Sequence, residues 1–314
     1  MTTTARLLTL LAPLTLLLAC GSDPDPLPSG LSAFFFGNSE WSPPVNVGAP
    51  INTDATENNC ALSPDDLSLY FTSNRAGGFG GADIWVAHRA CVECPWETPV
   101  NLGPTVNTAS GDQGPSISLD GHLLFFYSDR PGGEGSNDIY VSRRANPKDD
   151  FAWEAPVNLG PNINTAIFEA GPEYLQSAED GELNFYFGRA PVTGVGFSMY
   201  VAPLTRDGKA RGPAVLVPEL SPGTGATVRT DGREVVFLSA RPGGLGLQDL
   251  WVSTRRSVHD PWSTPENLTA LNSTAMDRHP SFSSNARTLI FASNRPGGFG
   301  GDDIWMSTRT PSGH

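Results

Sequence analysis

The feature that most constrains this sequence is an internal repeat, because a chain that repeats itself folds into similar units packed side by side. The clearest copy, residues 293–305, reads Ser-Asn-Arg-Pro-Gly-Gly-Phe-Gly-Gly-Asp-Asp-Ile-Trp. Related stretches recur upstream with a period of 51 to 60 residues, and their arginines are Arg75, Arg130, Arg189, Arg241 and Arg295. The sequence therefore predicts five structural units.

Each unit has the pattern of four strands. An apolar strand before the Gly-rich loop follows a turn and another short strand, and a strand containing Trp, Tyr or Leu follows the loop. The fourth segments span residues 41–47, 96–102, 153–159, 210–216 and 262–268. Four strands in about 50 residues are typical of a β-propeller blade. Because residues 41–47 precede the first full unit, we expect them to complete the last blade and close an all-β, five-bladed propeller.

These motifs allow a resemblance to be named. The order Asp-Gly, apolar strand, Ser-Asn/Asp-Arg-Pro-Gly-Gly, then Asp-Ile-Trp/Tyr-Val-Ser resembles the WD40-like repeat of TolB-type β-propeller proteins over about residues 40–309. The resemblance implies a propeller of the periplasm or cell envelope that binds proteins or saccharides, without a shared catalytic apparatus. It is a guide to fold more than to function.

The charge balance argues against one class of partner. The chain has 20 Lys and Arg against 33 Asp and Glu, which gives a formal net charge of -13. The basic residues are spread over the repeats, whereas binding to phosphate backbones needs them clustered. We therefore expect no nucleic acid partner.

The first 20 residues have the pattern of an export signal. Arg6 precedes an apolar run that is too short to span a bilayer as a helix. The run ends in Leu-Leu-Ala-Cys, which resembles the lipobox of bacterial lipoproteins and predicts lipidation of Cys20; an ordinary cleaved signal is the alternative. We expect residues 21–36 to be a flexible tether and residues 37–314 to be the propeller. The predicted location is the bacterial cell envelope, with a lipid anchor in the outer membrane and the propeller facing the periplasm or the exterior.

The Gly-rich loop is not expected to bind phosphate, because it joins two strands and does not lead into a helix. Its glycines suit a hairpin connection that needs positive φ angles. In four copies an Asp lies eight residues after the Arg, as in Arg75 and Asp83. We interpret that spacing as a structural clasp between the two ends of one hairpin.

A second repeated acid precedes each innermost strand except that of the fourth unit. These residues are Glu57, Asp112, Glu169 and Asp277. We expect them to lie near the mouth of the central channel, where unneutralised carboxylates would repel one another. Two interpretations stay open: ion pairs with the loop arginines that hold the fold together, or an oxygen-rich site for a ligand or Ca²⁺. No cofactor or metal is specifically predicted.

The repeat breaks in the third and fourth units. Ser198 replaces the loop Asp, Ala210 replaces a Trp, and Gly223 replaces the repeated acid, which leaves Arg241 without one. We predict that a ligand site lies there or that the repeat has decayed. The candidate ligand-binding residues are Glu57, Asp112, Glu169, Glu173, Arg229, Arg241, Asp277 and His279.

The remaining Trp and Cys patterns have structural explanations. The aromatic residues Trp85, Tyr140, Tyr200, Trp251 and Trp305 recur on a strand in every unit, so we expect core packing rather than sugar platforms. Cys91 and Cys94 favour a disulfide over zinc in an exported protein, because no second ligand pair accompanies them. Cys60 is expected to be a small buried residue.

The function predicted from the sequence is a non-catalytic scaffold that binds an envelope protein or a saccharide. The protein is predicted not to be an enzyme, since repeated carboxylates would have like environments whereas glycosidases need unlike ones. The alternative is a glycan-active, glycoside hydrolase-like enzyme that uses carboxylates on the same face. Two carboxylates about 5 to 10 Å apart and without Arg partners would favour that alternative.

Overall fold

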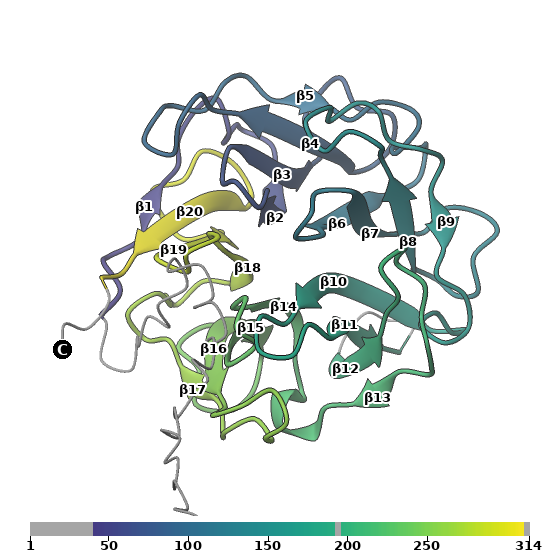
Figure 1. The fold of residues 1–314 in the computed structure, drawn as a ribbon. Helices are drawn as coiled ribbons and strands as arrows, with labels where there is room; N and C mark the ends of the chain where they lie inside the picture. The colour runs from purple at the N-terminus through teal and green to yellow at the C-terminus, as the bar shows by residue number, and fades with distance from the viewer. Residues whose placement is uncertain (1–39, 192–195, 311–314) are drawn as a thin grey trace, which may run out of the picture. The chain divides into compact units, whose positions relative to one another are not determined.

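The computed structural model describes residues 40–191 and 196–310. The predictions for residues 1–39, including lipidation of Cys20 and the tether, lie outside these residues. Within them, the chain forms five four-stranded antiparallel sheets arranged as the blades of a β-propeller (Figure 1). The predicted all-β, five-bladed fold is therefore confirmed.

In blades 1 to 4 the four strands follow one another in sequence from the channel outward. Blade 1 contains β2 (Glu57–Leu62), β3 (Ser68–Ser73), β4 (Asp83–His88) and β5 (Val100–Asn101). Blade 2 contains β6 (Asp112–Ile117), β7 (Leu123–Ser128), β8 (Asp138–Arg143) and β9 (Val157–Asn158). Blade 3 contains β10 (Phe168–Gln176), β11 (Leu183–Ala190), β12 (Ser198–Pro203) and β13 (Val215–Leu216).

Blade 4 follows a short 3-10 helix, η1 (Pro218–Leu220), and contains β14 (Thr224–Val228), β15 (Glu234–Ser239), β16 (Asp249–Thr254) and β17 (Glu266–Asn267). Blade 5 contains β18 (Asp277–Phe282), β19 (Thr288–Ser293), β20 (Asp303–Thr308) and, as its outermost strand, β1 (Val45–Asn46). Val45 pairs with Met306, and Trp41 forms a bridge with Arg309. The two ends of the described chain thus close the ring in the predicted way.

The outermost strands are shorter than predicted, with two residues each instead of about seven. In four of the five blades a proline immediately precedes the strand: Pro44, Pro99, Pro156 and Pro265. Proline has no N–H to donate to the strand ladder, so pairing cannot extend backward through it.

Apolar side chains fill the spaces between neighbouring blades. Each of five buried clusters draws its residues from two adjacent blades. Phe71, Phe125, Phe187, Phe237 and Phe291 are wholly buried on the second strands of the blades. Trp85, Tyr140, Trp251 and Trp305 are buried as predicted, while Tyr200 is partly exposed.

The innermost strands share a β-bulge that shapes the channel wall. Their pairing with the second strand shifts register at the same place in all five blades. The bulge residue has a positive φ in each blade, and these residues are Asn59, Gly114, Gly171, Gly225 and His279. A positive φ costs glycine little, whereas it is unusual for histidine. Three blades therefore present bare backbone at this level, and blades 1 and 5 present side chains.

Candidate functional site

The loop Asp and the loop Arg do not form the clasp that their spacing suggested. In blade 1, Asp83 accepts hydrogen bonds from the loop amides of Phe79 (2.5 Å) and Gly80 (3.2 Å) and from Asn101 on the outermost strand (2.9 Å). Asp138, Asp249 and Asp303 are bonded to corresponding loop amides and asparagines. The Asp therefore folds the Gly-rich loop around itself, and the Arg is directed elsewhere.

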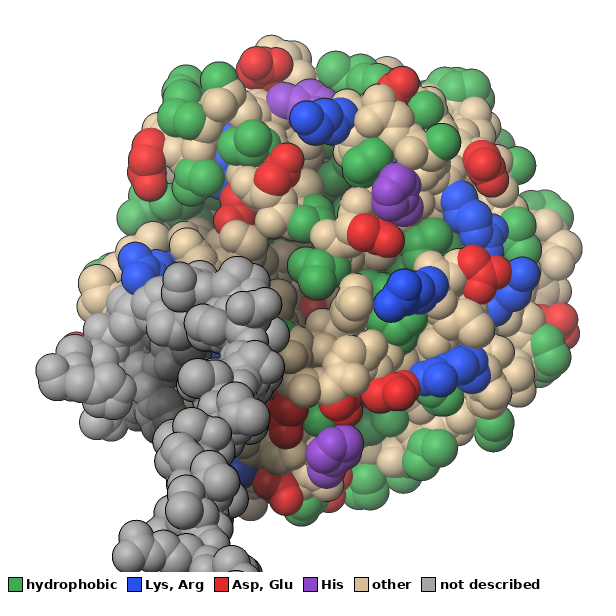
Figure 2. Space-filling model, viewed as in Figure 1, with side chains coloured by type: hydrophobic (Ala, Val, Ile, Leu, Met, Phe, Trp, Pro, Cys, Tyr) green, Lys and Arg blue, Asp and Glu red, His purple; other side chains and the backbone are tan. Residues whose placement is uncertain are grey.

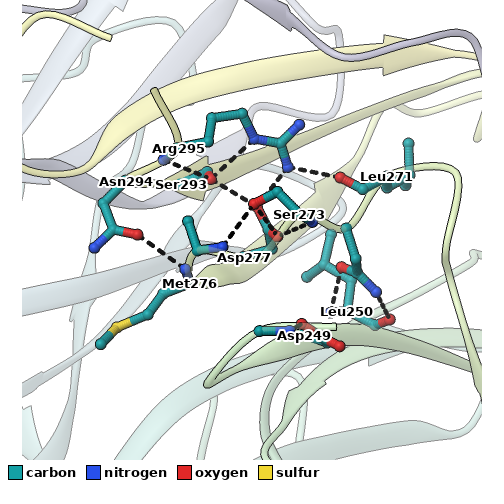
Figure 3. A network of polar contacts seen from close by, with 12 residues as sticks. Asp249, Leu250, Leu271, Ser273, Met276, Asp277, Ser293, Asn294 and Arg295 are labelled. Carbon is teal, nitrogen blue, oxygen red and sulfur yellow. Dashed lines mark hydrogen bonds and ion pairs between the residues drawn. The ribbon is translucent and has the colours of Figure 1, made fainter. Parts of the chain in front are cut away.

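The loop arginines instead bind the repeated acids. Arg75 contacts Glu57 at 3.0 Å, Arg130 contacts Asp112 at 2.5 Å, and Arg189 contacts Glu169 at 2.9 Å. Arg295 contacts Asp277, which also accepts hydrogen bonds from the hydroxyls of Ser273 and Ser293 (Figure 3). All four carboxylates have zero exposure. These ion pairs agree with the interpretation that the repeated acids hold the fold together. A role for the acids in ligand binding stays a prediction.

Each loop arginine also lies between two aromatic rings of its own blade. The Arg75 guanidinium is 4.9 Å from the centre of the Phe71 ring and 5.4 Å from that of Trp85. The other four blades repeat this arrangement. The cation is thus partly dehydrated and needs a counter-charge.

Arg241 in blade 4 is the exception among the five. It keeps the aromatic contacts, with Phe237 at 4.9 Å and Trp251 at 5.3 Å. Its hydrogen-bond acceptors are the Ser239 hydroxyl and the Pro222 carbonyl oxygen, so no carboxylate of the described chain reaches it. Burial lowers the pKa of both Arg75 and Arg241, but only Arg75 has a carboxylate, Glu57, opposing that effect.

Blade 3 has lost a different part of the repeat. Ser198 stands where the loop Asp would be, and Leu216 replaces the asparagine that binds this Asp in the other blades. On the opposite face, four blades stack a second arginine on a Trp, with centroid distances of 4.0 to 4.5 Å. Blade 3 carries Leu204 and Ala210 there. Sequence inspection identified the Trp series but missed its arginine partners Arg89, Arg144, Arg255 and Arg309.

Two cavities lie along the central channel. The larger, of about 100 Å³, is lined by residues of the innermost strands and of the turns that follow them, including Tyr174, Arg229 and Phe282. The smaller, of about 30 Å³, lies at the level of the bulges and includes Asn59 and His279 in its wall. Glu173 lines both cavities and is the only Asp or Glu in either wall.

Glu173 occupies a ring position that carries a small side chain in every other blade. The equivalent residues, which follow the bulge on each innermost strand, are Ala61, Ser116, Thr227 and Ser281. These residues link neighbouring blades, because Tyr174 N donates to Ser116 Oγ at 3.2 Å and Phe282 N donates to Thr227 Oγ1 at 3.2 Å. Glu173 makes the equivalent link between blades 3 and 4, because its Oε1 accepts a hydrogen bond from Val228 N at 2.9 Å. The acid is therefore fixed in position within the channel wall.

The environment of Glu173 disfavours its charged form. Part of the side chain is exposed to the channel, but protein surrounds it, and no cation of the described chain bonds it. Burial raises the pKa of Glu173 to about 8, although hydrogen bonds from Val228, Thr227 and Ser116 oppose the shift. At neutral pH this carboxyl group is mostly protonated, unlike an exposed one.

His279 is the second titratable group in the smaller cavity. Burial, helped by the charge of Arg278, lowers the pKa of His279 to about 3, so the imidazole is neutral at physiological pH. Its buried Nδ1 has no hydrogen-bond partner among residues 40–191 and 196–310. Together with Glu173 it makes the smaller cavity polar and uncharged at neutral pH.

The other predicted site residues are not brought together with these. Arg229 follows the end of β14, on the face opposite Arg241, and binds Asp231 and Glu234. Arg229 and Arg241 therefore do not lie together, because they flank opposite ends of β15 (Glu234–Ser239). Cys91 and Cys94 are joined by a disulfide in the β4–β5 connection, and Cys60 is a buried free thiol.

The face drawn in Figure 2 has no large area of a single charge sign. Figure 2 shows Asp and Glu interspersed with Lys and Arg over the face in view. Within residues 40–191 and 196–310, no cluster of three or more His, Cys, Asp or Glu could hold a metal ion. A search of the same residues found no helix with the length and apolarity needed to span a membrane.

Comparisons with known proteins give likeness in fold without likeness in sequence. No family model matches the chain, and no curated protein matches it. Among solved structures, an α-L-arabinofuranosidase from Lactobacillus brevis has a TM-score of 0.55 and 12% identity, covering 83% of this chain and 92% of its own. A GH43_1 enzyme from Xanthomonas citri complexed with xylotriose has a TM-score of 0.58 and 16% identity, covering 84% and 89%.

The TolB resemblance receives only weak structural support. A putative TolB from Agrobacterium tumefaciens shares 18% identity over 84% of this chain and 81% of its own, but its TM-score of 0.47 is too low to argue from. The five-bladed propeller that the resemblance implied is present, whereas membership of the family is not shown.

The prediction that the protein is not an enzyme is corrected by these comparisons. It followed the resemblance to a repeat family without a shared catalytic apparatus and ranked the glycoside hydrolase alternative second, whereas structures that share this fold include glycoside hydrolases. It also assumed that all carboxylates on the channel would have like environments. Glu173 breaks that symmetry, because it stands outside the repeated ion pairs and has a strongly raised pKa.

Proposed function

We propose that this protein is a glycan-active enzyme of the glycoside hydrolase type, with its reaction centre at Glu173 in the central channel. The observation that carries the proposal is the position of Glu173, which is the only carboxyl group in the walls of both cavities and has no cationic partner among the described residues. Its burial raises its pKa, which favours the protonated form at neutral pH. Such a group is suited to protonate the leaving oxygen of a glycosidic bond. The activities of the solved structures that share the fold support the same chemistry.

The lining of the larger cavity suits a saccharide. Tyr174 and Phe282 offer aromatic surface against which the apolar faces of sugar rings can pack. Ser63, Gln176 and Ser283 offer hydroxyl and amide groups for hydrogen bonds with sugar hydroxyls. By analogy with the two neighbours, the proposed substrates are oligosaccharides that contain arabinofuranosyl or xylosyl units.

In the proposed reaction, Glu173 donates its proton to the glycosidic oxygen as the bond from that oxygen to the anomeric carbon breaks. A water molecule then adds to the anomeric carbon. The Glu173 carboxylate accepts the proton that this water releases, which restores the acid. Glu173 is the only carboxyl group in the walls of the two cavities, so it serves first as acid and then as base, and the pair of carboxylates expected of a glycosidase is not found there. The hydrogen bond from Val228 N to Oε1 fixes the carboxyl group throughout.

The test is hydrolysis by wild type and by E173Q, which keeps an oxygen acceptor for Val228 N but cannot donate the proton. We expect wild type to cleave arabino- or xylo-oligosaccharides and E173Q to be about 10²- to 10⁴-fold slower. With 4-nitrophenyl glycosides, whose leaving group needs little protonation, the loss should be smaller. Activity on the oligosaccharides should fall as pH rises through about 8.

The controls are circular dichroism and thermal unfolding of both proteins at pH 6, where Glu173 is protonated. If correctly folded wild type hydrolyses neither the oligosaccharides nor the 4-nitrophenyl glycosides, the proposal is overturned. Equal loss on activated and unactivated substrates would remove the acid role from Glu173.

We further propose that the enzyme is anchored in the bacterial cell envelope through a lipid on Cys20. The proposal rests on the lipobox-like sequence before this residue. Labelling with a fatty-acid analogue in a bacterial host should mark wild type and not C20S, and C20S should leave the membrane fraction. Equal labelling of both proteins would refute it.

A further inference from the structure

We propose that Ser68, His88 and Asp150 form a second catalytic site, a Ser-His-Asp triad that hydrolyses carboxylic esters whose acyl group is as small as acetyl. The three residues are far apart in the sequence and meet between blades 1 and 2, outside both channel cavities. The inference goes beyond the proposed glycan activity and does not depend on it.

The contact between the serine and the histidine is built into blade 1. Ser68 begins β3, and its partner across the strand pair is His88 at the end of β4. The neighbouring pair is the hydrogen-bonded one, because Arg89 N donates to the Leu67 carbonyl oxygen at 3.0 Å. Ser68 and His88 therefore form a non-hydrogen-bonded pair, in which side chains approach more closely. Ser68 Oγ and His88 Nδ1 are 3.1 Å apart.

The acid is supplied by a longer connection in blade 2. Residues 144–156 join β8 to β9 and contain Asp150. The equivalent connections of blades 1, 3 and 4 are two residues shorter and span residues 89–99, 204–214 and 255–265. Oδ2 of Asp150 lies 3.2 Å from Nε2 of His88. The longer connection thus brings a carboxylate to the histidine of the neighbouring blade.

Asp150 is held so that one of its oxygens is directed at the histidine. Its Oδ1 accepts hydrogen bonds from Arg144 Nη1 and from the Tyr70 hydroxyl. Burial and the charge of Asp150 raise the pKa of Tyr70, so this hydroxyl stays protonated and donates. Oδ2 is left for His88, with a longer contact of 3.4 Å to Ser68 Oγ. The Asp150 side chain is 5% exposed, whereas that of His88 is 41% exposed and open to a substrate.

This arrangement decides which ring nitrogen of His88 carries the proton. An ionised carboxylate only accepts hydrogen bonds, so in the neutral imidazole Nε2 carries the proton that points to Asp150. Nδ1 then has a free lone pair and accepts from the Ser68 hydroxyl. The base contacts the nucleophile and the acid orients the base, which is the relation found in serine hydrolases with the two ring nitrogens exchanged.

The contact is not part of the structural repeat. The strand pairs at the same position of the other blades are Leu123 with Arg143, Asn184 with Pro203, Glu234 with Thr254, and Thr288 with Thr308. None of these four pairs joins a hydroxyl to an imidazole. The repeat therefore does not require a serine and a histidine here.

In the proposed reaction, Ser68 Oγ attacks the carbonyl carbon of the ester while Nδ1 of His88 takes the serine proton. The bond from that carbon to the alkoxy oxygen then breaks, and His88 gives the proton to the leaving alcohol. Water attacks the acyl-serine with His88 again acting as base, which releases the carboxylic acid and restores the Ser68 hydroxyl.

Two features of the site limit its substrates. The Ser68 amide donates to Ser63 Oγ at 2.8 Å, so it is not free to stabilise the oxyanion, and water at this exposed edge takes that role. Neither channel cavity includes Ser68 or His88, so neither can enclose a long acyl chain at this site. We therefore expect slow turnover that is fastest for short acyl groups on good leaving groups.

The test uses a fluorophosphonate, which reacts covalently with activated serines, and the ester 4-nitrophenyl acetate. We expect the fluorophosphonate to label Ser68 in the wild type, as located by peptide mass spectrometry, and S68A to lose this label. H88Q lacks the base, so the rates of Ser68 labelling and of 4-nitrophenolate release should both fall by about 10²-fold or more.

The matched control is S257A. Ser257 Oγ also donates to a carboxylate oxygen, Glu179 Oε1 at 2.6 Å, but it has no contact with an imidazole. S257A should change neither rate. Absence of label on Ser68 in the folded wild type would overturn the inference without the use of any variant. Labelling of Ser68 at the wild-type rate in H88Q, or equal ester hydrolysis by wild type and S68A, would also overturn it.

Asp150 acts through His88 and is a positioning residue, so its test needs a separate readout. In D150N the amide oxygen should stay with Arg144 and Tyr70, which turns the amide NH2 group toward Nε2. Nitrogen-15 NMR should therefore show the Nε2-protonated form of His88 in the wild type and the Nδ1-protonated form in D150N, together with slower labelling of Ser68. Loss of thermal stability in D150N, with the tautomer and the labelling rate of the folded protein unchanged, would contradict the triad.

Discussion

Blades 1, 2 and 5 differ from blades 3 and 4 in how completely they keep the polar part of the repeat. The three regular blades have the loop Asp with its asparagine, the Arg with its buried acid, and the second Arg stacked on Trp. Blade 3 lacks the first and third of these, and blade 4 lacks the acid of the second. Glu173 in blade 3 is an acid at a position that carries a small side chain in the other blades, and Arg241 in blade 4 is a loop arginine without a carboxylate partner among the described residues.

This difference indicates that the repeated and the exceptional positions have different roles. Repeated polar groups are satisfied by one another and hold loops and strands in place, so they are not open to a ligand. Positions that depart from the repeat leave a protonated acid and an uncompensated cation. Stability should therefore depend on the regular contacts, and ligand binding on the exceptions.

The largest expected effect distinguishes a paired arginine from the unpaired one. R295Q leaves the buried Asp277 without its cation and should reduce the free energy of unfolding by about 3 to 5 kcal/mol. R241Q removes a cation that has no carboxylate and should cost about 1 kcal/mol or less. Urea unfolding of both variants measures this, and similar losses would break the comparison.

The next effect concerns the loop Asp. D83A removes an acceptor shared by two loop amides and Asn101 and should lower the free energy of unfolding by about 2 to 3 kcal/mol. S198A, at the corresponding position of blade 3, should change it by less than about 0.5 kcal/mol. The same denaturant titrations compare the two, and a large loss in S198A would show that blade 3 has replaced this contact with another.

A third prediction uses the pH dependence of stability. The pKa of Glu173 is about 8 in the folded protein against an ordinary value near 4.5, so between these values only the unfolded chain loses the proton. Stability should fall as pH rises through this range and level off above it, by on the order of 2 kcal/mol after allowance for solvent in the channel. E173Q should remove the slope.

The measurement is thermal unfolding between pH 6.5 and 9. Below pH 6.5 the lowered pKa of His279, about 3, gives an opposite slope, since its unfolded form takes up a proton first. A wild-type profile between pH 6.5 and 9 that is as flat as that of E173Q would contradict the assigned environment of Glu173.

The smallest effect concerns the stacked Arg and Trp that blade 3 lacks. A double-mutant cycle with R255L and W262A should give a coupling energy of about 1 kcal/mol, because the guanidinium lies 4.0 Å from the ring centre. The double variant reproduces the Leu and Ala of blade 3. Zero coupling would mean that the pair contributes only apolar packing.

Much of the candidate site could be anticipated from the repeat alignment. Glu173 and Arg241 were both predicted because they fall where the pattern changes, and pairing of the repeated acids with the loop arginines was expected from charge repulsion. The acid that pairs with each arginine could not be identified from spacing. Arg75 lies eight residues from Asp83 and eighteen from Glu57, yet it binds Glu57. The hairpin loop folds back over Asp83 and uses its oxygens for backbone amides.

The sequence by itself determined the number of blades, their four-strand order and the closing role of the segment after Trp41. Periodic apolar positions and turn residues specify the strands locally. Because residues 41–47 have the pattern of a fourth strand but precede the first full unit, the ring closes when they complete the last blade. Tertiary structure decided the electrostatics. The pKa of Glu173 depends on residues from blades 2 and 4 that surround it, and the isolation of Arg241 depends on the Pro222 carbonyl and on the space around Gly223. Such environments arise only when distant segments pack together, because desolvation and hydrogen bonding depend on all neighbours in space.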